Sequence, residues 1–402
     1  MSLLDELSRV ETWEAFYQYK IGLVRPKDET KALREYIDRR DYLSVCAAVS
    51  RGETFPLPRR AVISKLHSEK KRIVYIYPEP ENTLLKLLTW LLLRRYDGLF
   101  SPGLYSFRPG RTAKDAIRSL LAVPGLRTMY AYKADISNYF NSIDVDRFLP
   151  ELERTLSEDP ALYAFLSALL REPRVLENGR ELREQKGIMA GTPLSAFYAN
   201  LYLQNLDREF SCLGIPYARY SDDIIFFAPT QAETEAHSAR LRSILGARGL
   251  LLNPAKETFY TPETGWTFLG FCCKNGEIDI APATLDKLKA KMRRKTRALS
   301  RWRDRTGHTG QQAASAFIRI FNRKLLESPT GSELSWSSWF FSVITTTESL
   351  HAIDCYAQDC LRVLISGKRT KARFNVRYED LKALGYRSLV HAYYAHLEGK
   401  TE

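Results

Sequence analysis

Tyr220-Ser221-Asp222-Asp223 is the stretch of sequence on which the prediction of the fold depends. It lies between two short apolar runs, residues 215–218 and 224–227, which are rich in aromatic and β-branched side chains and therefore favour strands. The Ser-Asp-Asp sequence between the runs predicts the tight turn of a hairpin. Two adjacent carboxylates at a hairpin tip repel each other and are not needed for folding, so a bound cation explains them. A lone Asp-Asp pair is more often a solvated acidic turn, and the surrounding motifs decide between the two interpretations.

Four further motifs accompany this hairpin along the chain. Upstream, a predicted strand ends at Asp135 and continues as a turn and a helix. Between the two carboxylate sites, a glycine-rich turn at residues 187–195 leads into a helix predicted over residues 196–210. Downstream come an Asn-Pro-Ala-Lys motif that ends at Lys256 and a Phe-Leu-Gly-Phe motif that ends at Phe271. The carboxylates therefore belong to an ordered set of motifs.

In this order and at this spacing, the set resembles the palm of reverse transcriptases, and it is most similar to bacterial ones of the group II intron, retron and defence-associated kinds. The resemblance runs from about residue 65 to Phe271. It implies an α+β right-hand polymerase with fingers and a palm, in which the palm is a split βαβ unit with an antiparallel sheet. We expect an N-terminal helical extension over residues 1–58, fingers and palm over 59–280, and a mainly α-helical thumb and C-terminal region over 281–402.

The composition is that of a globular protein with a polyanionic partner. The 402 residues can bury a sizeable core, and 45% of them are apolar, including 22 Tyr and 19 Phe. A net charge of +13 favours nucleic acid as the partner before a membrane. None of the six cysteines forms a Cys-x-x-Cys motif, which predicts reduced thiols in a cytoplasmic protein. The longest apolar run, residues 84–93, is too short to span a bilayer and predicts a buried helix.

The resemblance implies nucleotidyl transfer with two Mg²⁺ ions, for which Mn²⁺ is a possible substitute. Asp135 and Asp222 would supply the bridging carboxylates, and the carbonyl of Ile136 would complete one coordination sphere. Asp223, the remaining acidic residue of the expected metal site, would lie beside the primer end in a supporting role. Lys256 matches the position near the leaving pyrophosphate, where it would donate a proton. Asp207 is interpreted as structural, and so is Asp144, because Asp146 or Asp144 can cap the helix that begins near Arg147.

Residues 62–77 predict a basic hairpin of two strands, similar to the fingers hairpin of the family. Lys65 and Arg72 fit the spacing of the Lys and Arg that hold the incoming triphosphate in the family. A solvated charge run is the alternative for this segment. Arg108, in Ser-Phe-Arg-Pro-Gly-Arg, matches a fingers motif in which the Arg faces the template or nucleotide, and a structural ion pair is its alternative.

Two further residues are expected at the nucleotide. Phe140 matches the position where the family places an aromatic ring under the sugar, which would clash with a 2′-hydroxyl and select deoxynucleotides. Tyr139 is the alternative for this role, and packing in the core is the alternative to both. Gly191 belongs to the family's Gln-Gly motif, in which this chain has Ala190 instead of Gln. In the family this Gln normally braces the nucleotide or template, so its absence argues against general, processive copying and leaves specialised synthesis open. At position 221 the chain has Ser where Ala, Val or Met is commoner in the family.

The composition changes after residue 280. Residues 287–305 hold ten Lys or Arg and one Asp, interleaved with apolar residues, and predict a basic amphipathic helix. Its expected role is to follow the backbone of a template–primer duplex through phosphate contacts. A second charge run, residues 367–373, is a candidate for the same role. The nucleic-acid-binding residues predicted on the helix are Lys287, Lys291, Arg294, Lys295 and Arg301.

These observations favour an RNA-directed DNA polymerase whose partners are an RNA template, a DNA primer and product, and deoxynucleoside triphosphates. The C-terminal residues 381–390 resemble those of defence-associated enzymes, which implies an anti-phage role, a dedicated noncoding RNA, and a homo-oligomer or a companion defence protein. Synthesis without a template, or from a protein primer, is an alternative for the same site. An RNA-binding splicing protein with a relic palm is a third hypothesis, but a relic has no reason to retain Asp135, Asp222 and Asp223 together.

Overall fold

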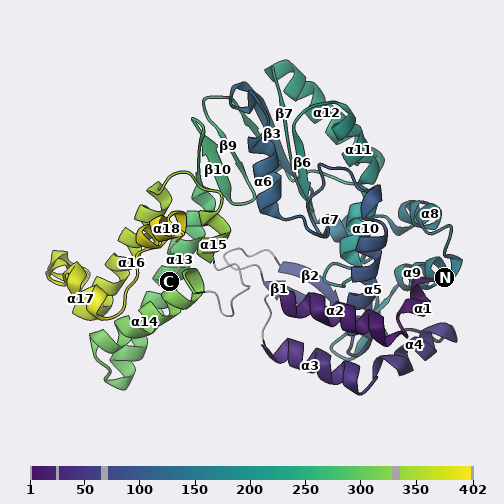
Figure 1. Cartoon of the computed structure of the whole chain (residues 1–402), viewed down its shortest axis with the longest axis horizontal. Helices are drawn as coiled ribbons and strands as arrows, with labels where there is room; N and C mark the ends of the chain where they lie inside the picture. The colour runs from purple at the N-terminus through teal and green to yellow at the C-terminus, as the bar shows by residue number, and fades with distance from the viewer. Residues whose placement is uncertain (1, 24–26, 65–70, 328–335, 400–402) are drawn as a thin grey trace. The chain divides into compact units, whose positions relative to one another are not determined.

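The computed structural model describes residues 2–23, 27–64, 71–327 and 336–399 (Figure 1). The chain forms two compact units, Met1–Pro262 and Glu263–Glu402, which we call the N-terminal and C-terminal units and describe separately. Both combine helices with mainly antiparallel sheets, which is the predicted α+β class. Among the described residues, no helix is both long enough and apolar enough to cross a membrane.

The first helices of the chain pack into the main core of the N-terminal unit. Trp13 and Phe16 are buried in the same hydrophobic cluster as the palm residues. The indole of Trp13 donates a hydrogen bond to the carbonyl of Leu7 at 2.8 Å, and the backbone N–H of Leu3 donates to the carboxylate of Asp159 at 2.8 Å. The helical character predicted for this region is observed, but its packing joins it to the rest of the unit. The helices are α1 (Leu3–Glu6), α2 (Val10–Gly22), α3 (Lys27–Asp38) and α4 (Tyr42–Ser50).

A four-stranded sheet in the order β2-β1-β4-β5 contains the predicted basic hairpin. β1 and β2 pair in antiparallel fashion, with Ile63 opposite Arg72. Arg60 on β1 forms ion pairs with Glu177 and with Glu184, which tie the hairpin to the second pair of strands. The strands are β1 (Arg59–Ser64), β2 (Lys71–Ile76), β4 (Arg174–Glu177) and β5 (Arg180–Arg183).

The second four-stranded sheet, in the order β6-β7-β3-β8, carries the hairpin that contains both adjacent aspartates. β6 and β7 are antiparallel with Tyr220 opposite Asp223, and β3 pairs with β7 so that Asp135 also lies opposite Asp223. The helix α12 packs against β3 and β7 (Figure 1). This is the antiparallel palm sheet that the sequence predicts. The strands are β3 (Tyr130–Asp135), β6 (Tyr217–Tyr220), β7 (Asp223–Ala228) and β8 (Thr258–Tyr260).

The remaining helices of the N-terminal unit confirm two predictions and correct one. The apolar run at residues 84–93 lies in the buried helix α5, and Asp144 caps α8 by accepting hydrogen bonds from the N–H groups of Asp146 and Arg147. The single helix predicted over residues 196–210 is wrong, because Leu203 leaves helical geometry at φ −106° and ψ 14°. The helices are α5 (Glu81–Arg95), α6 (Ala113–Leu121), α7 (Tyr139–Ser142), α8 (Val145–Thr155), α9 (Pro160–Arg171), α10 (Ser195–Tyr202), α11 (Gln204–Cys212) and α12 (Gln231–Ala247), with the 3₁₀ turns η1 (Asp97–Leu99), η2 (Leu126–Thr128) and η3 (Pro254–Lys256).

The C-terminal unit starts with a three-stranded sheet, 18 residues before the predicted boundary at residue 281. β10 pairs with both β9 and β11. Ile278 exchanges two hydrogen bonds with Thr345, each 2.8 Å long, and these join the sheet to the helices that follow. The strands are therefore part of the helical unit, which a boundary drawn from the change in composition misses. They are β9 (Trp266–Phe268), β10 (Phe271–Lys274) and β11 (Glu277–Ile280).

The helices of the C-terminal unit enclose one buried carboxylate and present one basic helix. Asp354 is buried and accepts hydrogen bonds from the hydroxyl of Tyr386 at 2.8 Å and from the backbone N–H of Leu389 at 3.0 Å. The predicted basic helix is α13, with Met292 and Leu299 on its buried side. The helices are α13 (Pro282–Thr306), α14 (Gly310–Leu325), α15 (Trp336–Phe341), α16 (Glu348–Ser366), α17 (Tyr378–Ala383) and α18 (Leu389–Leu397), with the 3₁₀ turn η4 (Lys371–Asn375).

Candidate active site

The palm sheet brings the three predicted aspartates to one place. Asp135, at the end of β3, lies opposite Asp223 at the start of β7. The backbone N–H of Ile136 donates to the carbonyl of Asp222 at 3.0 Å, so the hairpin tip is hydrogen-bonded to the end of β3. The carbonyl of Asp135 accepts from the N–H of Asn253 at 2.8 Å, which places the Asn-Pro-Ala-Lys motif beside the same strand end. Two strand ends, a hairpin and η3 therefore meet at one carboxylate cluster.

The carboxylates of this cluster disfavour each other's charge. Burial raises the pKa of Asp222, and the neighbouring charge of Asp135 raises it further. Burial also raises the pKa of Asp223; Lys133 opposes this shift, and Asp222 reinforces it. Desolvation and like-charge repulsion are the two causes that destabilise carboxylates in a folded protein. The site thus concentrates negative charge that a cation would stabilise.

The donor set fits a divalent cation such as Mg²⁺. Asp135 and Asp222 are two carboxylates close enough for the charge of one to act on the other, and Lys256 places its ammonium against the Asp135 carboxylate. Within the described part of the chain, no three His, Cys, Asp or Glu side chains form a ready-made metal cluster. Mg²⁺ does not require one, because it binds through one or two carboxylates and keeps water and phosphate oxygens in its shell.

A buried ion pair holds the hairpin in place. Arg219 and Asp207 are both completely buried, and the Arg219 guanidinium donates to Asp207 through Nε at 2.7 Å and through a terminal nitrogen at 2.5 Å. A second terminal nitrogen donates to the carbonyl of Ser221 at 3.0 Å, and the hydroxyl of Tyr217 donates to Asp207 at 2.7 Å. The structural interpretation of Asp207 is confirmed. The role of Arg219 escaped the sequence analysis, although an Arg inside an apolar strand is a signal that a buried acid must be nearby.

A second set of hydrogen bonds holds the turn of the hairpin at Ser221. Ser221 has a left-handed backbone with φ 60°, and its N–H donates to the hydroxyl of Ser106 at 2.9 Å. The Ser106 hydroxyl donates to the side-chain oxygen of Asn200 at 3.3 Å, and the Asn200 amide returns a 2.9 Å bond to the Ser106 carbonyl. All three residues are buried. Ser106 and Asn200 therefore position the tip that carries Asp222, a role that sequence analysis did not find.

The nucleotide-binding prediction for Arg108 is wrong. Its side chain is only 5% exposed and forms an ion pair with Asp97, with Nε at 2.7 Å from the carboxylate. The terminal nitrogens donate to the second Asp97 oxygen and to the carbonyls of Asp97, Ser101 and Leu104. All the donors of the guanidinium thus have partners within the chain, so the structural alternative holds.

Gly191 lies against the basic hairpin. Its φ is 98°, and a Cβ atom there would approach the Cβ of Val74 at 3.0 Å and the carbonyl oxygen of Tyr75 at 3.2 Å. The N–H of Tyr75 donates to the Ala190 carbonyl at 2.8 Å. The glycine therefore permits close contact between the fingers strand and the turn before α10, and its contact with nucleotide stays a prediction. Gly187 is equally constrained, because a Cβ would lie 2.4 Å from the Phe140 carbonyl oxygen.

The two aromatic residues after Asp135 have different environments. Tyr139 is buried and its hydroxyl donates to the Ala199 carbonyl at 2.6 Å, which makes it a core residue and removes it as an alternative sugar gate. Phe140 is only partly buried and makes an edge contact with Phe107, with ring centroids 6.4 Å apart. Phe107 is itself 39% exposed. Of the two neighbours, Phe140 alone remains available for contact with a nucleotide.

The remaining basic candidates lie in both units. Arg72 is exposed on β2, and its charge lowers the pKa of Asp222, so it acts on the carboxylate cluster. Lys65 lies outside the described residues. The five predicted residues of the basic helix lie on α13 away from its buried side, four of them exposed and Lys295 partly exposed: Lys287, Lys291, Arg294, Lys295 and Arg301.

An antiparallel sheet that presents paired carboxylates at a strand end and a hairpin tip is the palm arrangement of nucleotidyl-transferring polymerases. The family model "Reverse transcriptase (RNA-dependent DNA polymerase)" matches residues 66–273, more than half of the chain, and the chain therefore belongs to this family. The resemblance predicted from the motifs is confirmed.

Individual relatives are distant. The chain is 25% identical over 201 residues to the group II intron-encoded protein LtrA of Lactococcus lactis subsp. cremoris. The aligned segment covers 48% of this chain and 33% of that protein. It is 27% identical over 150 residues to an uncharacterised 91 kDa protein in the cob intron of Schizosaccharomyces pombe, covering 37% of this chain and 18% of that protein. The chain thus spans a third or less of these curated relatives. Among solved structures, apo telomerase from Candida tropicalis aligns with a TM-score of 0.45 at 12% identity, over 82% of this chain and 68% of that one.

The bracing of the hairpin tip yields a testable expectation for Ser106→Ala. The change leaves the buried N–H of Ser221 without its acceptor, a loss of about 1–3 kcal/mol, and lets the tip shift relative to Asp135. We expect kcat for nucleotide incorporation to fall roughly tenfold or more, because about 1.4 kcal/mol in the barrier is a factor of ten, while KM for the nucleotide changes little.

Steady-state kinetics on a primed template measures this effect. Ser106→Thr keeps the hydroxyl and should restore much of kcat. Thr89→Val is the matched control, because it also removes a buried hydroxyl of the same unit, one that bonds only to the Leu85 carbonyl within α5. A loss of kcat in Thr89→Val equal to that in Ser106→Ala would show that the effect is general destabilisation.

Proposed function

We propose that this chain is an RNA-directed DNA polymerase that joins deoxynucleotides to a primer at the cluster of Asp135, Asp222 and Asp223. The observation that carries the proposal is the register of the palm sheet, which sets Asp135 opposite Asp223 and bonds the hairpin tip to the end of β3. Membership of the reverse transcriptase family supports the same reaction. The substrates that follow from it are an RNA template, a DNA primer and deoxynucleoside triphosphates.

The reaction is an in-line attack of the primer hydroxyl on the α-phosphate, with pyrophosphate as the leaving group. Two bound Mg²⁺ ions supply charge that activates the hydroxyl and stabilises the leaving group. Asp135 and Asp222 would hold the cations, with the carbonyl of Ile136 as a further ligand and Asp223 as a supporting carboxylate. The contact of Lys256 with Asp135 keeps its ammonium beside the site, from where it protonates the departing pyrophosphate. Arg72 contributes positive charge toward the triphosphate from β2.

Asp135→Asn and Asp222→Asn should each lower nucleotide incorporation by at least about a thousandfold. Each removes one negative charge from a site that must hold cations contributing several kcal/mol to the transition state. The thermal stability of Asp222→Asn should stay the same or rise, because this substitution relieves repulsion within the cluster. The measurement is primer extension at saturating Mg²⁺, together with thermal unfolding of the same preparations.

Asp144→Asn is the matched control for these variants. Asp144 is a nearby acidic residue whose side chain caps α8, and Asn caps a helix as well as Asp. Its activity should equal that of the unchanged protein. Incorporation by Asp222→Asn at the rate of this control would remove the cluster from the reaction.

We propose further that Phe140 selects deoxynucleotides. Its partly exposed ring lies five residues after Asp135, and Asp135 fixes the position of the metal and therefore of the α-phosphate. A ring held by packing cannot move aside for a 2′-hydroxyl without cost, so Phe140→Ala should raise the ratio of kcat/KM for a ribonucleotide over that for the deoxynucleotide of the same base. The conservative control is Tyr139→Phe, which removes the hydrogen bond to Ala199 and should leave the ratio unchanged. An unchanged ratio in Phe140→Ala would place sugar selection elsewhere.

Finally, we propose that the enzyme copies a dedicated noncoding RNA in the cytoplasm of a bacterium as part of anti-phage defence. Two features support this assignment: Ala190 replaces the usual Gln of the turn, and residues 381–390 resemble the ends of defence-associated enzymes. The alternatives that use the same carboxylates are synthesis without a template and synthesis from a protein primer.

Sequencing the nucleic acid that copurifies with the protein, together with the chemistry of its 5′ ends, separates these cases. One RNA species with complementary DNA is the expected result. DNA without a complementary RNA would indicate synthesis without a template, and DNA that remains bound to protein after denaturation would indicate a protein primer. An intron RNA without any DNA would favour a splicing protein and overturn the proposal.

A further inference from the structure

The C-terminal unit contains a small basic pocket that the polymerase reaction does not use. Its volume is about 200 Å³, and it lies between α13, α16 and the segment that follows α16. Four arginines line it, two from α13 and two from the following segment, together with Tyr356 and Asp359 of α16: Arg293, Arg297, Arg369 and Arg373. We call these residues the arginine pocket.

Within the described part of the chain, three of the four guanidinium groups have no hydrogen-bond or ion-pair partner. Arg373 is fixed, because its Nε donates to Asp359 at 2.5 Å and a terminal nitrogen donates to the carbonyl of Arg369 at 3.0 Å. That ion pair occupies the acidic residue of the pocket. The side chains of Arg293, Arg297 and Arg369 make no hydrogen bond or ion pair with any residue in the described ranges. The pocket thus holds three unpaired forked donors, the geometry that matches phosphate oxygens.

The pocket lies at one edge of the basic side of α13 that is predicted to follow a duplex. At about 100° per residue, Arg293 and Arg297 lie on one flank of the buried stripe of α13, whose centre is Met292. Lys287 and Lys291 lie on the opposite flank by the same arithmetic. Arg294 and Arg301 lie between these flanks, so the basic side of the helix is continuous, and the pocket is formed at the edge that carries Arg293 and Arg297.

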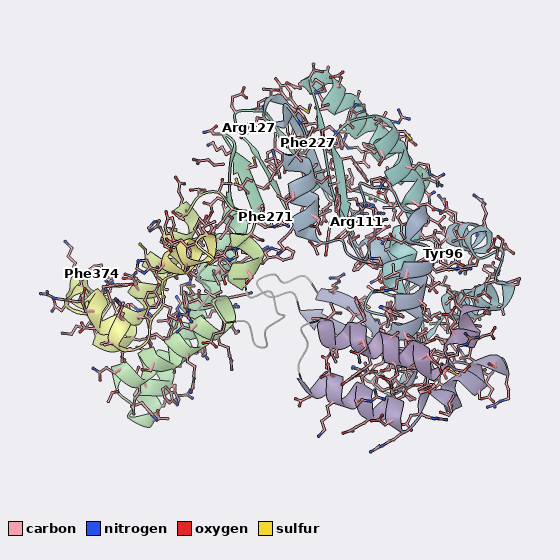
Figure 2. The ribbon with its side chains drawn as sticks, viewed as in Figure 1. Tyr96, Arg111, Arg127, Phe227, Phe271 and Phe374 are labelled. Atoms are coloured by element: carbon pink, nitrogen blue, oxygen red, sulfur yellow. The ribbon has the colours of Figure 1, made fainter. Side chains whose placement is uncertain are left out.

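An exposed aromatic ring adjoins the pocket. Phe374, which follows Arg373 in η4, is 54% exposed at the surface of the C-terminal unit (Figure 2). The guanidinium of Arg373 lies 4.4 Å from the centroid of the ring, and that of Arg362 lies 5.7 Å away. Single exposed apolar residues are common on proteins. This one is held by two cations, one of which also lines the pocket, so a ring face and a phosphate-sized site occur side by side.

We propose that the arginine pocket and Phe374 together bind one nucleotide of a single-stranded nucleic acid, with a phosphate among the arginines and the base stacked on the ring. The volume is below the roughly 300–1,000 Å³ of pockets that enclose drug-sized ligands, which suits a phosphate group and leaves the base outside. Aromatic rings stack on bases of single strands, whereas the bases of a duplex are already paired and stacked. The inference rests on the proposed function for its ligand, which is either a single-stranded part of the template RNA or the DNA product.

The test measures the dissociation constants of the full-length protein for a labelled ten-nucleotide RNA, the DNA of the same sequence, and a blunt RNA–DNA duplex, at several salt concentrations. R293Q/R297Q should weaken single-strand binding at least tenfold and lower the slope of log affinity against log salt by about 0.7, because the pocket holds one phosphate contact. Phe374→Ala should weaken it about five- to a hundredfold with an unchanged salt slope, because stacking releases no counterions. Duplex binding should change less than twofold in both variants.

Two further variants make the test specific. R319Q/R323Q removes two exposed arginines at the same spacing from α14, outside the pocket, and is the matched control for charge. R293K/R297K keeps the positive charge but loses the forked donors of the guanidinium groups. The slope of log affinity against log salt should therefore persist while the affinity falls. Tighter binding of RNA than of DNA by the unchanged protein would identify the template as the ligand, and the reverse would identify the product.

The proposal is overturned if R293Q/R297Q weakens single-strand binding no more than the α14 control, or if duplex binding falls in parallel with it. Primer extension by the same variants keeps this outcome separate from the proposed function. Extension with unaffected single-strand binding in the variants would reject the pocket alone. Lost single-strand binding in the variants, together with no nucleotide incorporation by the unchanged protein, would retain the pocket and reject the polymerase assignment.

Discussion

The buried ion pair between Arg219 and Asp207 is the interaction on which the geometry of the catalytic hairpin depends. Both side chains are completely buried. Burial alone would lower the pKa of Arg219, but the charge and hydrogen bonds of Asp207 raise it above its ordinary value. Removing one partner of such a pair leaves an uncompensated buried charge, which lowers the free energy of unfolding by about 3–5 kcal/mol. Since the same guanidinium holds the Ser221 carbonyl, the position of the neighbouring Asp222 is set by the core of the palm.

This arrangement resolves a conflict within the site. The carboxylates are partly desolvated and repel one another, so an unsupported turn would relieve the repulsion by moving them apart. Three interactions oppose that movement: the pairing of β3 with β7, the hydrogen bond from the Arg219 guanidinium to the Ser221 carbonyl, and the hydrogen bond from the Ser221 N–H to the Ser106 hydroxyl. The fold therefore holds the carboxylates close together before any cation or phosphate binds. Such advance positioning of charged groups is called electrostatic preorganisation.

The sequence could predict those features that depend on local pattern. The Tyr-Ser-Asp-Asp hairpin, the strand that ends at Asp135 and the cap at Asp144 each follow from a few adjacent residues, and each is observed. Features that depend on distant partners were missed. Arg108 has the sequence context of a ligand-facing residue, but its partners are provided by the fold.

The same limit applies to larger features. The C-terminal unit begins with three short strands, and Ile278 of β11 bonds to Thr345, 67 residues away. Composition gives no sign of that contact. The helix break at Leu203 leaves the apolar pattern of the sequence uninterrupted, since residues on both sides of it are buried in the same core. The apolar pattern of the sequence thus predicts well which helices and strands form. It predicts poorly where they end and which residues they contact.

The left-handed backbone of Ser221 has a consequence for the evolution of the motif. Residues other than glycine occupy this conformation at a cost of about 1–2 kcal/mol, and β-branched residues are the least suited to it. The identity of the residue at position 221 is therefore restricted by its torsion angles in addition to the burial of its side chain. As long as the turn keeps this geometry, small or turn-forming residues are favoured at position 221 over β-branched ones.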